Sequence, residues 1–163
     1  CNTTDEDELN EAMEELKIQS KLNKAYTIDE VRDKMINGAA AIGVIYSGEY
    51  LYCQEENEDL EYVIPKEGTN IWYDGWVITK GSENVENAHK WIDFLCSQEA
   101  AYDNFEYIYY GTPNIAAQEL IDEDIINNPG VFPDEETIEK CEVYNYLGEE
   151  AEDMYYELWK KVK

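Results

Sequence analysis

An aromatic segment that contains a single carboxylate holds the residues best suited to chemistry. Residues 71–79 have the sequence Ile-Trp-Tyr-Asp-Gly-Trp-Val-Ile-Thr, and strand alternation places Trp72, Asp74 and Trp76 on one face. A carboxylate beside indole and phenol rings suits an organic ammonium group, because the acid supplies charge and each ring face supplies cation–π attraction of about 0.5–2 kcal/mol. The same residues also fit a structural role, with Trp72 and Trp76 in a core and Asp74 capping a turn. The pattern leaves both interpretations open.

Other candidate chemistries lack the spacing that they need. The single histidine, His89, lies seven residues before Cys96, and two helical turns separate such positions by about 10 Å, too far for a hydrogen bond. We therefore expect His89 on a helix surface. No phosphate-binding loop or calcium-binding loop is present, and the cysteines form no C-x-x-C pair. The sequence predicts no catalytic residue, no metal and no cofactor. The even number of cysteines, Cys1, Cys53, Cys96 and Cys141, permits disulfides, but a chain of this length can form a core without them, so we expect four isolated thiols.

The charge of the chain excludes whole classes of partner. Its 163 residues include 12 basic and 38 acidic side chains, for a formal net charge of −26. Nucleic acids and anionic membrane surfaces would be repelled, whereas cations would be attracted. The 44% hydrophobic content predicts a folded chain rather than an acidic disordered tail. No apolar stretch approaches the roughly 18–20 residues that span a bilayer, and the first residues do not form a signal peptide.

Helical periodicity and capping residues predict most of the elements. A helix capped by Thr4 extends to about residue 20, with Leu9 and Met13 on its apolar face. A capping box, residues 27–30, begins a second helix that ends at Asn37-Gly38. Further helices are expected over residues 84–96, 98–107, 114–121 and 147–161.

Three short apolar segments predict strands between these helices. Residues 40–46 form an apolar run bounded by glycine, which is typical of a strand buried on both faces of a partly parallel sheet. Residues 62–64 and 71–79 are the other two candidates. Strands that alternate with helices indicate an α/β fold.

Four motifs resemble those of the polyamine-binding proteins, the spermidine/putrescine-binding components of bacterial ABC importers. They are Pro-Lys-Glu-Gly at 65–68, Ile-Trp-Tyr-Asp at 71–74, Tyr-Gly-Thr-Pro-Asn-Ile-Ala-Ala at 110–117 and Phe-Pro-Asp at 132–134, followed by a tyrosine-rich closing helix. The resemblance covers nearly the whole chain but only about the second half of the family's usual length. It implies that Cys1 is an ordinary interior position of a longer protein.

The resemblance implies a two-lobed fold of the periplasmic-binding-protein-like type II class, of which this chain is about the C-terminal half. Residues 1–69 and 121–163 would then belong to the C-terminal lobe, and residues 70–120 to the N-terminal lobe. The implied function is that of an extracytoplasmic solute-binding component of an ABC importer, and not an enzyme. Its partners would be putrescine or spermidine and the permease subunits, with self-association through exposed strand edges also considered. The alternative is an acidic protein-interaction domain without a small-molecule site.

The family's pocket, carried over by position, implies five ligand-binding residues. Trp72 would pack on the polyamine methylenes and Asp74 would pair with an ammonium group. Tyr110 matches a pocket tyrosine, and Tyr46 stands where the family commonly has Trp. Tyr144 falls where the family often has a Gln, which leaves the preferred polyamine open. The remaining large aromatics are expected in the core: Tyr73, Trp76, Trp91 and Trp159.

Overall fold

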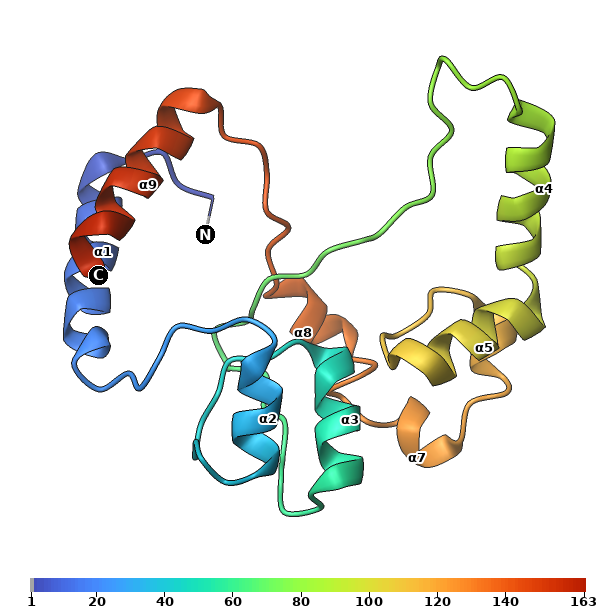
Figure 1. Cartoon of the computed structure of the whole chain (residues 1–163), viewed down its shortest axis with the longest axis horizontal. Coiled ribbons are helices and arrows are strands. Elements are labelled where there is room, and N and C mark those ends of the chain that lie inside the picture. The colour runs from blue at the N-terminus through green and yellow to red at the C-terminus, as the bar shows by residue number, and fades with distance from the viewer. Residues whose placement is uncertain (1) are drawn as a thin grey trace.

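The computed structural model describes residues 2–163, which form helices joined by long extended connections (Figure 1). The helices within this range are α1 (Glu6–Ser20), α2 (Glu30–Ile36), α3 (Ser47–Glu56), α4 (Val85–Leu95), α5 (Gln98–Ile108), α6 (Ile115–Gln118), α7 (Glu123–Ile126), α8 (Glu135–Glu139) and α9 (Glu149–Val162). Cys1 lies outside the described residues. The other three cysteines are free thiols, as expected.

The first and last helices pack together at one end of the molecule (Figure 1). Leu9 and Met13 of α1 are buried against Leu158 and Val162 of α9, so the predicted apolar face is confirmed. The N-cap is Asp5 rather than Thr4, because the Asp5 carboxylate accepts hydrogen bonds from the backbone N–H groups of residues 7 and 8 at 2.9 and 3.1 Å. This cap satisfies two otherwise unpaired donors of the first turn.

A second core joins the middle of the chain. Tyr50 and Leu51 of α3 meet Phe105 of α5, and Ile121 and Val131 complete this buried cluster. Phe105 is only 3% exposed. This core fixes the N-terminal end of α3 relative to the C-terminal end of α5, and both ends carry candidate site residues.

Two features near the start of the chain differ from the sequence prediction. The capping box at residues 27–30 does not form, since α2 begins at Glu30 without a side-chain cap. The second difference is α3, which the sequence analysis did not predict. Its apolar residues Tyr50, Leu51 and Cys53 are buried, but four glutamates and glutamines among ten residues obscure the helical periodicity.

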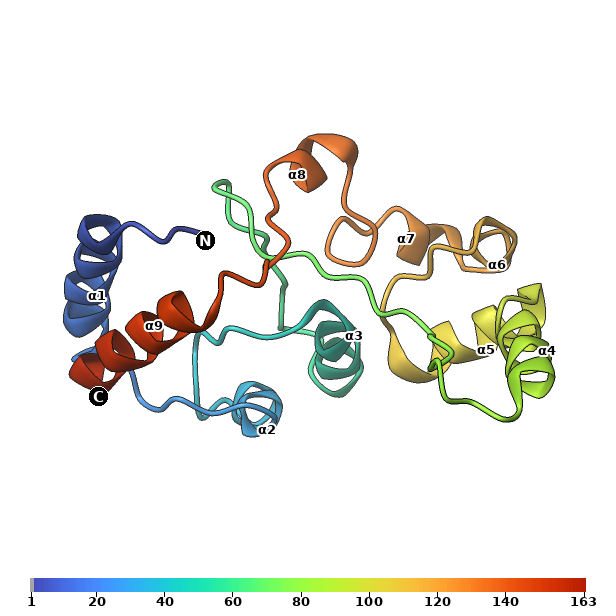
Figure 2. The ribbon, with the colours of Figure 1, turned by 90° about the horizontal axis from the view of Figure 1, so that it is seen from above.

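None of the three predicted strands forms within residues 2–163. Residues 40–46, 62–64 and 71–79 are extended connections, and one parallel bridge, Asn70 to Glu142, is the only β-pairing in the described chain. Within that part of the chain, residues 41–45 and 72–78 make no backbone–backbone hydrogen bonds. Strands exist only where a neighbouring strand pairs with their backbone groups, and no backbone pairing joins these segments to one another, although they run as separate extended traces (Figure 2). The extended shape was predicted correctly, but the sheet was not.

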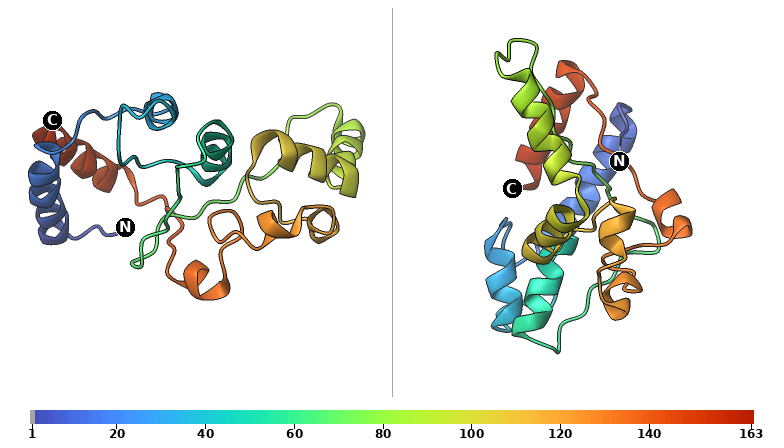
Figure 3. Two further views of the ribbon diagram at one scale, coloured as in Figure 1. Left: turned by 90° about the horizontal axis from the view of Figure 1, so that it is seen from below. Right: turned by 90° about the vertical axis from the view of Figure 1, so that its right-hand side faces the viewer.

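Large apolar side chains on these segments face solvent. Val44 is 96% exposed, Ile42 90% and Val77 82%. The apolar face of α4 is also uncovered, since no residue of that helix is buried, and Figure 3 shows α4 at the edge of the molecule. Exposed apolar patches of this kind mark surfaces that another polypeptide covers.

Three of the four aromatic residues that were predicted in the core are exposed instead. Tyr73 is 75% exposed, Trp76 69% and Trp91 52%; in residues 2–163 nothing covers them. Only Trp159 packs as expected, against the core of α1 and α9. His89 is exposed on α4, so its predicted place on a helix surface is confirmed.

Candidate ligand-binding site

Three of the predicted site residues form an aromatic cluster. The ring centroids of Tyr46 and Trp72 lie 5.3 Å apart with an interplanar angle of 72°, and those of Trp72 and Tyr110 lie 5.9 Å apart at 69°. The Trp72 indole therefore stands edge-to-face between two phenols, an arrangement that aromatic quadrupoles favour. We call Tyr46, Trp72 and Tyr110 the aromatic trio.

The N-terminus of α3 positions the Tyr46 ring. Tyr46 is the N-cap residue, with extended φ and ψ of −76° and 151°, so the extended connection over residues 40–46 ends where the helix begins. Two residues later, Gly48 is buried against Tyr110: a Cβ on Gly48 would lie 2.5 Å from two Tyr110 ring carbons and 2.8 Å from the Ile108 carbonyl oxygen. The missing side chain at Gly48 thus allows α3 to approach the Tyr110 ring.

The C-terminus of α5 positions the Tyr110 ring. Tyr109 ends the helix in a left-handed conformation with φ of 59°, which is uncommon for a residue other than glycine. Its hydroxyl donates a 2.7 Å hydrogen bond to Glu55 of α3. This bond connects the two helices, and Tyr110 continues past the turn to meet Trp72.

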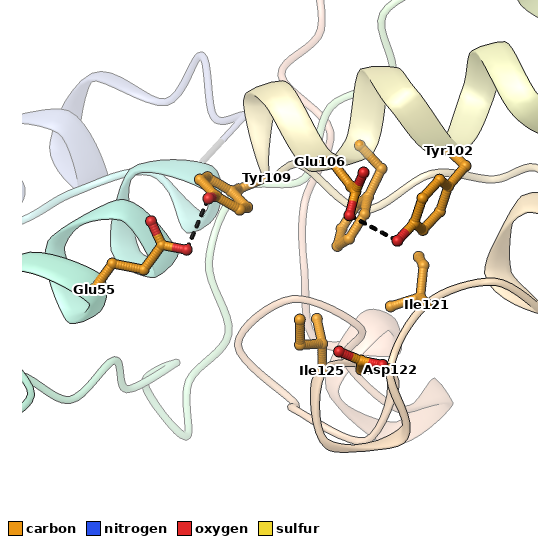
Figure 4. A pocket seen from close by; sticks show the side chains of 8 residues that line it. Glu55, Tyr102, Glu106, Tyr109, Ile121, Asp122 and Ile125 are labelled. Atoms are coloured by element: carbon orange, nitrogen blue, oxygen red, sulfur yellow. Dashed lines mark hydrogen bonds between the residues drawn. The ribbon is translucent and has the colours of Figure 1, made fainter.

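A separate cavity lies beside this turn (Figure 4). The Tyr109–Glu55 hydrogen bond lies at one side of it, and on α5 the Tyr102 hydroxyl donates a 2.6 Å hydrogen bond to Glu106. These hydrogen bonds are the main cause that raises the pKa of both tyrosines. The cavity includes none of the five predicted site residues; its lining is Glu55, Tyr102, Phe105, Glu106, Tyr109, Ile121, Asp122 and Ile125.

The charges around the trio are negative. Burial raises the pKa of the Tyr110 phenol, and the nearby Glu49 carboxylate raises it further, followed by Tyr46, Tyr62 and Asp74. Asp74 is exposed and follows Trp72 by two residues. Because the Asp74 charge contributes to the raised pKa of Tyr110, this carboxylate lies within electrostatic range of that ring. A carboxylate in this position could accept hydrogen bonds from a cation.

The structure does not bring Tyr144 into the trio. The bridge between Asn70 and Glu142 is parallel, so Tyr144 is in register with Trp72 two residues further along. The pairing does not continue beyond this single bridge. Residues 143–145 instead contact the Asn2 side chain, which donates a 2.9 Å hydrogen bond to the Val143 carbonyl and accepts a 2.9 Å hydrogen bond from the Asn145 N–H. Tyr144 remains 67% exposed.

Glu49, the carboxylate whose charge affects the pKa of Tyr110 most, was not among the predicted site residues. It lies in the first turn of α3, three residues after Tyr46. Residues three apart share one face of a helix. The signal was therefore present in the sequence, but it could be recognised only if residues 47–56 were known to be helical.

The exposure of the trio bears on the two interpretations of the aromatic segment. Trp72 is 39% exposed and Tyr46 52%, while Tyr110 is half-buried and Asp74 is exposed. Within residues 2–163, Trp72 and Trp76 are therefore not core residues. The arrangement offers ring faces and carboxylates to a ligand from solvent.

Replacing Gly48 by alanine is expected to destabilise the packing of α3 on Tyr110. The new methyl group would overlap the ring and a backbone oxygen, and overpacking typically costs about 1–3 kcal/mol, more than the up to about 1 kcal/mol that alanine gains in a helix. Urea unfolding should show a lower midpoint. Gly75→Ala is the matched control because open space surrounds that position; equal midpoints for the two variants would contradict the expectation.

An aromatic cluster with carboxylates beside it and solvent access is the arrangement that would suit an organic cation as a ligand. The sequence model of bacterial extracellular solute-binding proteins matches residues 4–133. The chain belongs to this family.

Polyamine-binding proteins are among the relatives that the chain resembles. It is 35% identical over 162 residues to the spermidine/putrescine-binding periplasmic protein of Salmonella typhimurium, a match that covers 99% of this chain and 46% of the relative. The putative spermidine/putrescine ABC transporter protein of Listeria monocytogenes superposes with a TM-score of 0.87 at 39% identity, over 99% of this chain and 50% of that one. The substrate-binding protein of a spermidine/putrescine transporter from Streptococcus pneumoniae gives a TM-score of 0.89 at 36% identity.

The chain thus spans about half the length of the relatives that it matches. The solved relatives superpose on almost all of it, which supports the predicted relationship to half of a binding-protein fold. Within residues 2–163, no helix combines the length and the hydropathy needed to cross a bilayer.

Proposed function

We propose that this chain supplies one side of a polyamine-binding cleft in an extracytoplasmic solute-binding protein of an ABC importer. The observation that carries the proposal is the half-exposed aromatic trio with Asp74 beside it. The names of the relatives support the ligand class, since they bind spermidine and putrescine or belong to transporters of them.

The chemistry of a polyamine fits this surface. Putrescine and spermidine are methylene chains that carry protonated amines, so they need apolar ring faces along the chain and an anion at each charge. Trp72 offers the largest ring for the methylenes, and Asp74 offers an anion for one ammonium group. An ammonium group that leaves water is costly unless it meets such a partner. The net charge of −26 adds a general attraction for polycations that salt screens.

The fold proposal is a two-lobed type II binding protein in which this chain is about the C-terminal half. Residues 1–69 and 121–163 would contribute to one lobe, and residues 70–120 to the other. The exposed apolar side chains of Ile42, Val44 and Val77 support this proposal, because strands supplied by the absent half would cover them and pair with their backbone.

The proposed protein acts outside the cytoplasmic membrane and delivers its ligand to permease subunits without changing it chemically. The periplasmic relatives support this location and this role. Without its other half, the chain would also expose apolar edges through which copies could associate.

Calorimetry on a completed protein tests the proposed ligand. In the completed protein, a chimera, this chain replaces the matching half of the Listeria protein, which it resembles at 39% identity. Putrescine and spermidine are expected to give saturable one-to-one binding, whereas acetate and free glutamate should give none. A folded chimera that shows no heat with either polyamine would overturn the proposed ligand class.

A further inference from the structure

Glu49 lies beside the aromatic trio in a position that the family resemblance does not assign. It follows the N-cap Tyr46 by three residues in the first turn of α3. Its neighbour Gly48 packs directly on the Tyr110 ring. The side chain of Glu49 is 30% exposed, so it is neither buried nor fully solvated.

One oxygen of this carboxylate is held by an arginine. The Arg32 Nη1 of α2 lies 3.3 Å from Glu49 Oε2, and the Arg32 guanidinium also lies 4.7 Å from the centroid of the Tyr52 ring. Within residues 2–163, Glu49 Oε1 accepts no hydrogen bond from the protein. The carboxylate therefore keeps one acceptor available, and Arg32 partly neutralises its charge.

At Tyr110, the charge of Glu49 acts more strongly than that of Asp74. After burial, Glu49 is the largest contributor to the raised pKa of Tyr110, and Asp74 is the smallest of the four neighbouring groups. The N-terminus of α3 carries a partial positive charge that would disfavour a cation beside Tyr46. A glutamate in the first turn offsets this effect.

We propose that Glu49 is a second carboxylate of the polyamine site and that Arg32 limits its strength by pairing with it. The inference rests on the proposed function. A diamine has two charges to satisfy, and the chain then offers Asp74 for one and Glu49 for the other, both near the aromatic trio. Arg32 sets the affinity by competing with the ligand for Glu49.

Charge-removing variants of the completed protein test both parts of the inference. Glu49→Gln is expected to weaken putrescine binding by about threefold to tenfold, because a partly exposed ion pair is lost. Arg32→Met is expected to strengthen it by about twofold to fivefold, and this gain should vanish in the Glu49→Gln background. Glu56→Gln removes the same charge at the far end of α3 and should leave the affinity unchanged.

The outcomes test the role of Glu49, the role of Arg32 and the proposed function separately. Unchanged affinity for Glu49→Gln, when Asp74→Ala does weaken binding, would place Glu49 outside the site. Unchanged or weaker binding by Arg32→Met would overturn the role of Arg32. A flat titration of the unmodified completed protein would instead overturn the proposed function.

A measurement without ligand tests the geometry in this chain alone. Glu49→Gln should lower the pKa of Tyr110, since the nearby negative charge is removed, whereas Glu56→Gln should not. NMR of protein labelled with ¹³C at tyrosine Cζ follows this titration, and Tyr110→Phe assigns the signal. An unchanged pKa in Glu49→Gln would show that the carboxylate does not face the trio and would overturn the inference.

Discussion

Replacing Asp74 by alanine in the completed protein is expected to weaken polyamine binding by about tenfold or more. The variant leaves one ammonium group without its anion in a site that partly excludes water, and truncating one member of such a pair typically costs about 2 kcal/mol or more. Calorimetric titration with putrescine measures the change. The same substitution should have little effect on folding, because the Asp74 side chain is exposed.

Two further variants separate the local role of Asp74 from the general charge. Asp93→Ala removes an exposed carboxylate from α4 and is expected to leave the affinity within about twofold, as surface charges away from a site contribute little. Asp74→Asn keeps the shape and removes the charge, so it should behave like Asp74→Ala. Retention of full affinity by Asp74→Ala would remove this residue from the site.

The chain alone is expected to bind putrescine at least about a hundredfold more weakly than the completed protein. Solute-binding clefts gain affinity when two lobes enclose the ligand, and an open surface leaves half of its contacts to water. Indole fluorescence and calorimetry can follow both proteins in parallel. High salt, about 0.5 M, screens the attraction that the net charge of −26 exerts on any polycation.

Far-ultraviolet circular dichroism compares the strand content of the chain alone with that of the completed protein. The chain alone should show a helical spectrum with little strand signal, and the completed protein should gain strand signal as residues 40–46 and 71–79 find partners. Micromolar binding by the chain alone would contradict the expectation, since it would mean that this half suffices. Sedimentation velocity on the same sample shows whether copies associate through the exposed segments.

Periodicity in the sequence located the helices that have a clear apolar face. Leu9 and Met13 recur at helical spacing, and the structure buries both in the α1–α9 pair. The same reasoning located α4 and α5 to within two residues. It failed for α3, because four of its ten residues are glutamate or glutamine and its buried residues do not form a clear apolar stripe.

The composition of one segment also identified a candidate site. Trp72 and Asp74 stand out because aromatic rings around a carboxylate suit an organic cation, and the motif resemblance added Tyr46, Tyr110 and Tyr144. Three of these residues meet as the aromatic trio. Their role with a ligand is the proposal that the titrations test.

Only the tertiary structure decided which side chains meet. Glu49 and Arg32 belong to different helices, and nothing in their spacing shows that Arg32 pairs with a carboxylate beside Tyr110. The absence of strands in residues 2–163 was equally hidden, since an apolar run specifies an extended shape but not the neighbour that must pair with it. Local pattern determines local conformation, whereas contacts between distant residues depend on how the whole chain packs.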